Sequence, residues 1–166
     1  MGAGKTSVGT LLARRTGWRF VDIDQEIEAE AGRTIPEIFA TDGEAAFRRW
    51  EADAVARWVR QDHVVLAPGG GWAAEEGRLD GVPPGTATVW LQVAPEEAVR
   101  RAGSSPGQRP LLAGDDPLRT ARRMLEARTP RYAAARWRVD TERSSVEDVT
   151  AQILNYLATQ PLEHTD

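Results

Sequence analysis

The sequence predicts an α/β protein in which a parallel β-sheet is flanked by helices on both faces. Short apolar segments that read as strands alternate with segments of helical periodicity, and this alternation is typical of parallel sheets. The 166 residues suit one domain with a full hydrophobic core. The 41% hydrophobic and 28% charged residues are typical of a globular protein. We therefore expect a single domain over residues 1–158 and a loose tail over residues 159–166.

The individual elements follow from the apolar pattern. Val8, Leu11 and Leu12 recur at helical spacing and predict a first helix over residues 6–13. The predicted strands are residues 19–22, 63–67, 86–93 and 137–139. The next predicted helices are residues 25–30, which Gly32 ends, and residues 35–39. A long helix follows, which Asp42 could cap and which reaches Trp58. The last predicted helices are residues 95–101, 118–128, 131–135 and 146–157.

Residues 103–116 form a segment of different composition. They hold three glycines, two prolines, two serines and two aspartates, which predicts a mobile surface loop of the length of a lid. Arg109 lies inside it. An arginine on a lid can swing over a transferring phosphoryl group and neutralise its charge, although Arg109 could also be one more solvated arginine.

The composition excludes several classes of protein. No cysteine is present, which rules out disulfide scaffolds, thiolate-bound zinc and thiol catalysis, and fits the cytoplasm. No apolar run reaches the about 18 residues of a membrane-spanning helix, and no leader pattern supports secretion. The 21 basic and 25 acidic residues give a net charge of −4, whereas nucleic-acid-binding proteins usually carry a basic surplus. We expect neither a membrane nor a nucleic acid as partner.

The first residues are typical of a phosphate-binding loop. Gly2, Ala3, Gly4, Lys5 and Thr6 match the last part of the pattern Gly, four residues, Gly-Lys-Ser/Thr. In such a loop the glycines let backbone N–H groups surround phosphate oxygens, and the following helix presents its positive end. Lys5 would contact the β and γ phosphates, and the Thr6 hydroxyl would bind Mg²⁺. Of the 21 basic residues, Lys5 is the single lysine, and its compact ammonium suits this role.

The first half of that loop and the strand that leads into it do not precede Gly2 in this sequence. In a parallel sheet such a strand is central and is buried on both faces. We therefore expect the leading central strand to be missing from the sheet, and Met1 to be an internal methionine of a longer protein. We expect the chain as written to be unstable or inactive, because each lost large side chain costs a few kcal/mol of a total of about 5–15 kcal/mol.

Asp22 and Asp24 stand two residues apart at the end of a predicted strand, where strand periodicity would point both the same way. One carboxylate could hold Mg²⁺ or its water, and the other could accept a proton from a substrate hydroxyl. The alternative is that one of them only caps the following helix. The phosphate-binding loop upstream favours the functional interpretation.

Three further features carry weaker signals. Arg48 and Glu51 are three apart on a predicted helix and share a face, which is also the spacing of an ordinary surface ion pair. The three glycines from Gly69 onward follow a strand, and they would either let a ligand approach the backbone or form a flexible turn. Arg128 ends a helix, where an arginine also interacts favourably with the helix dipole.

Taken together, these residues resemble the shikimate kinase family. The match runs from Gly2 to about residue 157 and keeps the order and spacing of the motifs. Trp72 is a departure, because the family usually has a small residue after the glycines. The matching parts are Gly-Ala-Gly-Lys-Thr, Asp22-Ile23-Asp24, Ile38-Phe39 with Gly43-Glu44, Phe47-Arg48 followed by Glu51, Gly69-Gly70-Gly71, Arg109-Pro110-Leu111-Leu112, and Arg128 with Tyr132.

The resemblance implies a nucleoside-monophosphate-kinase-like P-loop fold with a lid. It also implies transfer of the γ-phosphoryl of ATP to the 3-hydroxyl of shikimate, on the route to chorismate and the aromatic amino acids, with Mg²⁺ as cofactor. By this resemblance the nucleotide is bound by Gly2, Ala3, Gly4, Lys5, Thr6, Ser7, Arg101 and Arg109, and the metal by Thr6 and Asp22. Shikimate is bound by Asp24, Arg48, Glu51, Gly69, Gly70, Gly71 and Arg128, and the catalytic residues are Lys5, Asp24 and Arg109.

Two alternatives stay open at this point. Another small-metabolite kinase of the same fold, such as a gluconate kinase, fits as well, because Arg48 with Arg128 indicates only a substrate that bears a carboxylate. The other alternative is a nucleotide-binding module without phosphoryl transfer. Asp24 and Arg109 speak against that module, because binding alone needs neither. We expect ATP and shikimate as partners of a monomer.

Overall fold

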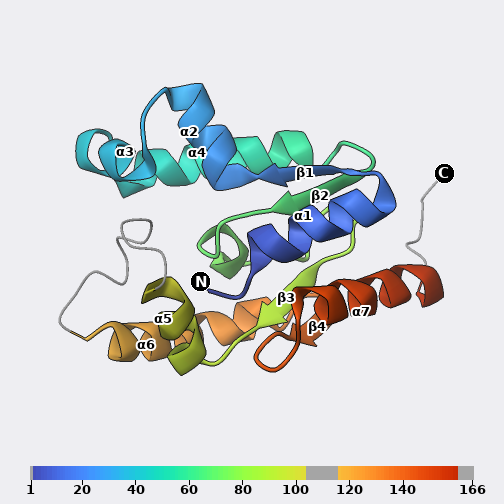
Figure 1. The fold of residues 1–166 in the computed structure, drawn as a ribbon. Coiled ribbons are helices and arrows are strands. Elements are labelled where there is room, and N and C mark those ends of the chain that lie inside the picture. Colours follow the sequence, from blue (N-terminus) through green and yellow to red (C-terminus); the bar gives the residue numbers. More distant parts are fainter. Residues whose placement is uncertain (1, 104–115, 161–166) are drawn as a thin grey trace.

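The computed structural model describes residues 2–103 and 116–160. Residues 104–115, which hold most of the predicted lid and Arg109, lie outside the described residues, as do residues 161–166 of the predicted tail. The elements (Figure 1) are α1 (Lys5–Thr16), β1 (Arg19–Asp22), α2 (Ile23–Ala31), α3 (Ile35–Thr41), α4 (Glu44–Trp58), β2 (Val64–Ala67), the 3₁₀ turn η1 (Trp72–Ala74), β3 (Val89–Gln92), α5 (Pro95–Gly103), α6 (Pro117–Tyr132), β4 (Trp137–Asp140) and α7 (Val146–Thr159).

The strands are parallel and lie in two pairs. β1 pairs with β2, from Arg19 opposite Val64 to Asp22 opposite Ala67, and β3 pairs with β4 in the same sense. In the described part of the chain no strand joins β2 to β3. The predicted class, parallel strands between helices, is confirmed, and the sheet is interrupted between its two pairs.

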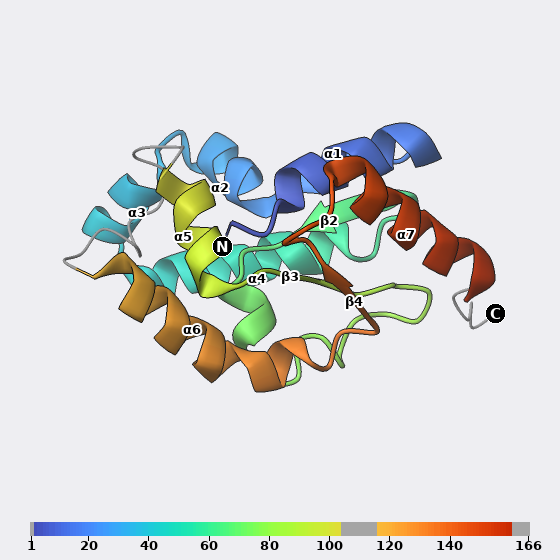
Figure 2. The same ribbon diagram turned by 60° about the horizontal axis from the view of Figure 1, so that its bottom comes forward.

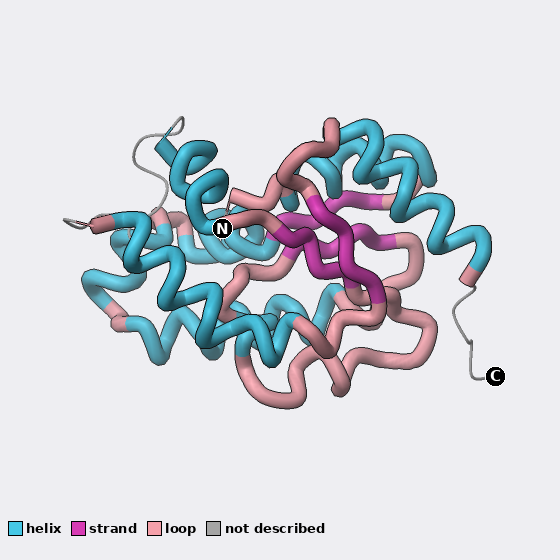
Figure 3. Tube along the Cα trace, turned by 90° about the horizontal axis from the view of Figure 1, so that it is seen from below, coloured by secondary structure: helices cyan, strands magenta, loops and turns pink. Residues whose placement is uncertain are grey.

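Helices cover both faces of the strands, as Figures 2 and 3 show from two further directions. On one face α1 and α7 pack against each other, and on the other face α4 and η1 cover β1 and β2. Each face has its own apolar core. The first core is built on Val8, Leu12, Val139, Val149 and Ile153, and the second on Val21, Ile23, Ile27, Ile38, Phe47, Ala54, Val55 and Trp72.

Helix α1 lies unusually close to β1. A Cβ on Gly9 would collide with the ring of Phe20, so the absence of a side chain at residue 9 permits this approach. The helix then ends at Gly17, whose φ of 75° is in the left-handed region that favours glycine. This close packing fixes the first turn of α1 above the end of β1, where the candidate site lies.

Two sequence-based expectations about helix boundaries are wrong. Asp42 does not cap α4, because its carboxylate pairs with Arg33 at 2.6 Å, and Gly43, with a φ of 81°, takes the N-cap position. The two helices expected over residues 118–128 and 131–135 form the single helix α6. Pro130 lies in the last turn of α6, where its missing N–H removes one hydrogen bond from a helix that ends two residues later.

No helix within residues 2–103 and 116–160 has the length and the apolar character needed to cross a membrane.

Candidate active site

The phosphate-binding motif forms a loop that enters α1 through Gly4. Gly2 has a φ of 67° and Gly4 a φ of 82°, both in the left-handed region. A Cβ on Gly2 would lie 2.7 Å from the carbonyl oxygen of Ala98 in α5, so no side chain fits there. Gly4 has no side chain to cap the helix, and Lys5, Thr6 and Ser7 occupy the first turn behind it. This is the geometry of an anion site at a helix N-terminus.

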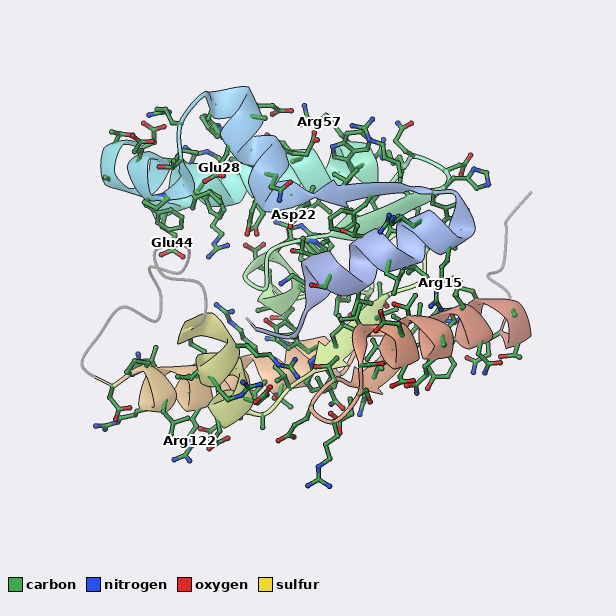
Figure 4. The ribbon with its side chains drawn as sticks, in the orientation of Figure 1. Arg15, Asp22, Glu28, Glu44, Arg57 and Arg122 are labelled. Carbon is green, nitrogen blue, oxygen red and sulfur yellow. The ribbon has the colours of Figure 1, made fainter. Side chains whose placement is uncertain are left out.

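Asp22 joins the end of β1 to that first turn. Its Oδ2 accepts a hydrogen bond from Thr6 Oγ1 at 3.1 Å, and its Oδ1 accepts one from the backbone N–H of Asp24 at 3.2 Å. Asp22 therefore caps α2 and faces the phosphate-binding loop at the same time, so the two interpretations of this residue do not exclude each other. Figure 4 labels Asp22, which lies between β1 and α1.

The pair of Thr6 and Asp22 fits a Mg²⁺ ion. A hydroxyl and a carboxylate offer hard oxygen donors, and Mg²⁺ is usually held by one or two protein groups together with phosphates and water. Within the described residues, no cluster of three or more His, Cys, Asp or Glu could hold a metal by itself. The donor set therefore suits a metal that arrives with a nucleotide.

Asp24 lies in the first turn of α2, because β1 ends at Asp22. The expectation that strand periodicity aligns the two aspartates is thus wrong, although the two charges still influence each other. Burial of the carboxyl and the neighbouring charge of Asp22 raise the pKa of Asp24 above its ordinary 3.8, although Lys5 and Arg48 act to lower it. A raised pKa suits a group that accepts a proton.

Arg48 and Glu51 form an ion pair on α4 whose carboxylate is buried. Arg48 Nη1 donates to Glu51 Oε2 at 2.7 Å, and Arg48 Nη2 donates to Glu44 Oε1 at 3.2 Å. The Glu51 side chain is 1% exposed, and its second oxygen, Oε1, has no hydrogen-bond partner among the described residues. Because Glu51 is buried, the ion pair holds the Arg48 guanidinium in a defined orientation. It is therefore not the ordinary surface ion pair that the spacing of the two residues also allowed.

The three glycines after β2 lie where these side chains converge. A Cβ on Gly69 would collide with Glu51 Oε1 and would lie 3.5 Å from Asp24 Oδ1. A Cβ on Gly71 would overlap the guanidinium of Arg48, with its Nη2 at 2.7 Å. Glycine is required here because polar side chains from two helices already occupy the space.

Helix α6 reaches the middle glycine from the other side. A Cβ on Gly70 would lie 3.4 Å from Arg128 Nη1 and 3.0 Å from Tyr132 Oη. The Tyr132 hydroxyl donates to the Gly70 carbonyl at 2.8 Å, and its ring packs against Trp90 with centroids 5.7 Å apart. Sequence reasoning assigned no role to Tyr132. Its position one helical turn after Arg128 is the signal that could have found it.

Arg101 lies between three segments. Its Nη2 donates to the Thr141 carbonyl at 2.7 Å, its Nη1 to the Gly2 carbonyl at 3.3 Å, and its Nε to Glu97 Oε1 at 2.6 Å. The residue thus joins α5 and the turn after β4 to the phosphate-binding loop. Its contact with adenine stays a prediction.

Parallel strands, a glycine loop that opens a helix with Lys5 and Thr6, and a carboxylate facing that helix define a small-molecule kinase of the P-loop class. The family model described as "Shikimate kinase" matches residues 1–158. The chain belongs to the shikimate kinase family, and the family predicted from the order of its motifs is confirmed.

Individual relatives agree with this assignment. A protein of Symbiobacterium thermophilum named shikimate kinase is 46% identical over 159 residues, which are 95% of this chain and 91% of that protein. A structure titled shikimate kinase from Acinetobacter baumannii in complex with shikimate superposes with a TM-score of 0.89 at 33% identity, covering 98% of this chain and 91% of that one. A gluconokinase from Sinorhizobium meliloti matches with a TM-score of 0.61 at 20% identity and shares the fold alone.

The contact between Gly70 and Tyr132 leads to a stability prediction. Gly70→Ala overpacks the site and should destabilise the protein by about 1–3 kcal/mol. Tyr132→Phe removes the hydroxyl that the new methyl would strike, at a cost of about 0.5–1.5 kcal/mol. We expect the double variant to be less destabilised than the sum of the two, as measured by urea denaturation. Tyr156→Phe on the distant α7 is the control and should be additive with Gly70→Ala. If Tyr132→Phe were as additive with Gly70→Ala as Tyr156→Phe is, the result would contradict the contact between Gly70 and Tyr132.

The buried Glu51 leads to a pH prediction. Burial raises its pKa above the ordinary 4.5, and Arg48 does not fully compensate. Where a carboxyl has a higher pKa in the folded than in the unfolded state, the protein loses stability as the pH rises from the unfolded-state pKa to the folded-state pKa. Glu51→Gln imitates the protonated form. The Tm of the wild type minus that of Glu51→Gln should therefore decrease as the pH rises above the ordinary value of 4.5.

Glu37 supplies the control of opposite sign. Hydrogen bonds from Thr34 hold its pKa below the ordinary 4.5. Its contribution to stability is present above that value and is lost as the pH falls. The Tm difference between the wild type and Glu37→Gln should therefore increase as the pH rises toward 4.5. Parallel pH profiles for the two variants would refute the assignment for Glu51.

Proposed function

We propose that this chain transfers the γ-phosphoryl group of ATP to the 3-hydroxyl of shikimate, with Mg²⁺ as cofactor, and that the site described above carries the reaction. The observation that supports it best is the convergence on the glycine backbone of residues 69–71. Two guanidinium groups and two carboxylates meet there, from Arg48, Arg128, Asp24 and Glu51. A substrate that carries both a carboxylate and hydroxyl groups matches this set.

On the nucleotide side, residues 2–4 would surround the β phosphate with backbone N–H groups. The Lys5 ammonium would neutralise the β and γ phosphates, and the exposed Ser7 would lie beside them on the first turn of α1. Arg109, outside the described residues, would add a positive charge from the lid. These groups position the γ phosphate and stabilise charge, which is most of what phosphoryl transfer requires.

Thr6 and Asp22 would hold Mg²⁺. The ion would supply positive charge that stabilises the phosphate groups during transfer. The hydrogen bond between Thr6 and Asp22 keeps these two oxygen donors adjacent, so the metal site needs little rearrangement.

On the acceptor side, Arg48 and Arg128 would bind the substrate carboxylate. Glu51 would act as a positioning residue that fixes the Arg48 guanidinium, and Tyr132 would fix the carbonyl of Gly70. Bidentate pairing of guanidinium with carboxylate gives both charge and direction, so the ring hydroxyls would be oriented toward Asp24.

Asp24 would act as the base of the reaction. The oxygen of the substrate hydroxyl forms a bond to the γ phosphorus while the bond from that phosphorus to the β,γ-bridging oxygen breaks. The hydroxyl proton passes to the Asp24 carboxylate, and the electron pair of the broken bond leaves with ADP. The raised pKa of Asp24 brings its proton affinity closer to this task.

The test is release of ADP measured with a panel of acceptors. Shikimate should support turnover, and gluconate and nucleoside monophosphates should not. Turnover with gluconate in place of shikimate would favour the gluconate-kinase alternative. ATP binding without turnover on any acceptor would favour a nucleotide-binding module. A monomeric state and a cytoplasmic location stay predictions.

Replacing Asp24 separates the base from the nucleotide site. Asp24→Asn should lower kcat by about 10²–10⁴-fold, because the amide cannot accept the proton. The affinity for ATP should change little, since the residue faces the acceptor side. Asp53→Asn, an exposed position on α4, is the control. Loss of ATP affinity with an unchanged kcat at saturation would move Asp24 to the metal or nucleotide site.

Replacing the two arginines tests the carboxylate site. Arg48→Ala and Arg128→Ala should each raise the KM for shikimate by on the order of a hundredfold, because each leaves a desolvated carboxylate without its partner. The KM for ATP should stay nearly constant. The exposed neighbours Arg49→Ala and Arg123→Ala are matched controls. Normal shikimate binding by both site variants in calorimetry would refute the assignment.

A further inference from the structure

One buried polar side chain lies close to the phosphate-binding loop without belonging to the site described above. The buried polar side chains in the described part of the chain are Glu51, Thr141 and Thr150. Glu51 belongs to the acceptor side, and the hydroxyl of Thr150 donates to the Val146 carbonyl within α7. Thr141 is 4% exposed and directly follows β4, at the end of the strand that lies nearest to the phosphate-binding loop.

Thr141 joins the ends of β3 and β4. Its backbone N–H and its hydroxyl both donate to the carbonyl of Gln92, the last residue of β3, at 2.9 and 2.8 Å. A hydroxyl that donates its one proton can still accept a hydrogen bond. The Thr141 Oγ1 accepts from Arg101 Nη1 at 3.3 Å, and the Thr141 carbonyl accepts from Arg101 Nη2 at 2.7 Å. Thr141 therefore presents two acceptors to one guanidinium, and the bonds to Gln92 hold the hydroxyl in place.

Glu97 holds the same guanidinium from another edge. It lies one turn before Arg101 on α5 and accepts from Arg101 Nε at 2.6 Å. Hydrogen bonds from Arg100 and Arg101 lower the pKa of Glu97 to about 2, so its carboxylate is charged near neutral pH. A guanidinium is planar, so acceptors at two of its edges fix the orientation of the plane. Thr141 and Glu97 together give the Arg101 guanidinium one favourable orientation.

That orientation acts on the first peptide of the phosphate-binding loop. Arg101 Nη1 also donates to the Gly2 carbonyl at 3.3 Å. Figure 2 shows this part of the chain beside α5, where a Cβ on Gly2 would lie 2.7 Å from the Ala98 carbonyl oxygen. In a planar trans peptide the C=O and the N–H point to opposite sides. A fixed Gly2 carbonyl therefore also fixes the direction of the Ala3 N–H, one of the groups that would contact phosphate.

We propose that Thr141 is a positioning residue for phosphate binding: it holds Arg101, and Arg101 holds the peptide between Gly2 and Ala3 in the orientation that the nucleotide phosphates require. Thr141 acts through Arg101 and needs no contact of its own with the nucleotide. This inference rests on the proposed function, because it takes residues 2–4 as the phosphate site. If Thr141 only joined β3 to β4, its loss would lower stability without lowering nucleotide affinity.

The first test replaces Thr141 and measures the Kd for ADP by calorimetry, which does not depend on turnover. Thr141→Val keeps the shape of the side chain but removes its donor and acceptor. The Kd should rise about tenfold, the effect of losing one hydrogen bond to a charged group. The KM for ATP should rise by a similar factor, and kcat and the KM for shikimate should change by less than about twofold.

Two further variants separate positioning from stability. Thr141→Ser retains the hydroxyl and should restore the Kd for ADP to within about twofold of the wild type. Thr150→Val makes the same change at a buried threonine of α7 and should lower the Tm while leaving this Kd unchanged. An equal rise of the Kd in Thr150→Val would overturn the proposal, because a general loss of stability would then explain the effect.

Glu97 supplies a second variant that remains informative if Thr141→Val does not fold. Glu97→Ala removes the acceptor at the other edge of Arg101 and should also raise the Kd for ADP. The matched control is Glu96→Ala, because Glu96 on the same helix pairs with Arg122 on α6 and should leave the Kd unchanged. A folded Thr141→Val that binds ADP like the wild type, or a Glu97→Ala that binds it as well as Glu96→Ala, would overturn the proposal. ADP binding that depends on Thr141 in a chain that does not phosphorylate shikimate would count against the proposed function alone.

Discussion

The backbone of residues 69–71 lies so close to polar side chains from three helices that no side chain can grow from it. Glu51 and Arg48 on α4 occupy the space that a Cβ on Gly69 or Gly71 would need, and Tyr132 on α6 lies 3.0 Å from a Cβ on Gly70. Asp24 on α2 and Arg128 on α6 lie at contact distance beside them. These helices lie far apart in the sequence, and the glycine loop is the place where they meet. Any residue other than glycine would push one of these groups away, so the shape of the site depends on three missing side chains.

Burial turns this contact into a rigid arrangement. Glu51 is almost inaccessible, and its charge is partly compensated by Arg48, which Glu44 holds from the far side. Because an unpaired buried carboxylate is expensive, the guanidinium has one favourable position, and it lies against Gly71. On the opposite side Tyr132 binds the carbonyl of Gly70, so the loop is held from both directions. A ligand that binds there meets groups that are already oriented, which lowers the entropy cost of binding.

Much of this could be predicted from the sequence, because the motifs are local. The bounds of β1 were predicted to the residue, and Gly32 ends α2 as expected. The closeness of Asp22 and Asp24 was predicted for the wrong reason, because the helix was expected to begin at residue 25, whereas α2 begins at Ile23, directly after β1. Asp42 was misassigned because a cap and an ion pair with Arg33 have the same local sequence. The convergence on residues 69–71 could not be derived from periodicity, because it depends on how three helices pack.

The charges around Asp24 make the pKa of its carboxyl depend on which ligands occupy the site. In the empty site its proton affinity is raised by burial and by Asp22, and lowered by Lys5 and Arg48. In the proposed complex, phosphate groups lie against Lys5 and a carboxylate lies against Arg48. Both positive charges are then compensated by ligand anions, and the groups that lower the pKa of Asp24 lose part of their effect. In that proposed complex, a Mg²⁺ ion held by Asp22 would act in the opposite direction, because it would compensate the charge that raises this pKa. The acceptor carboxylate and the phosphates thus favour proton transfer to Asp24, while the metal limits the rise.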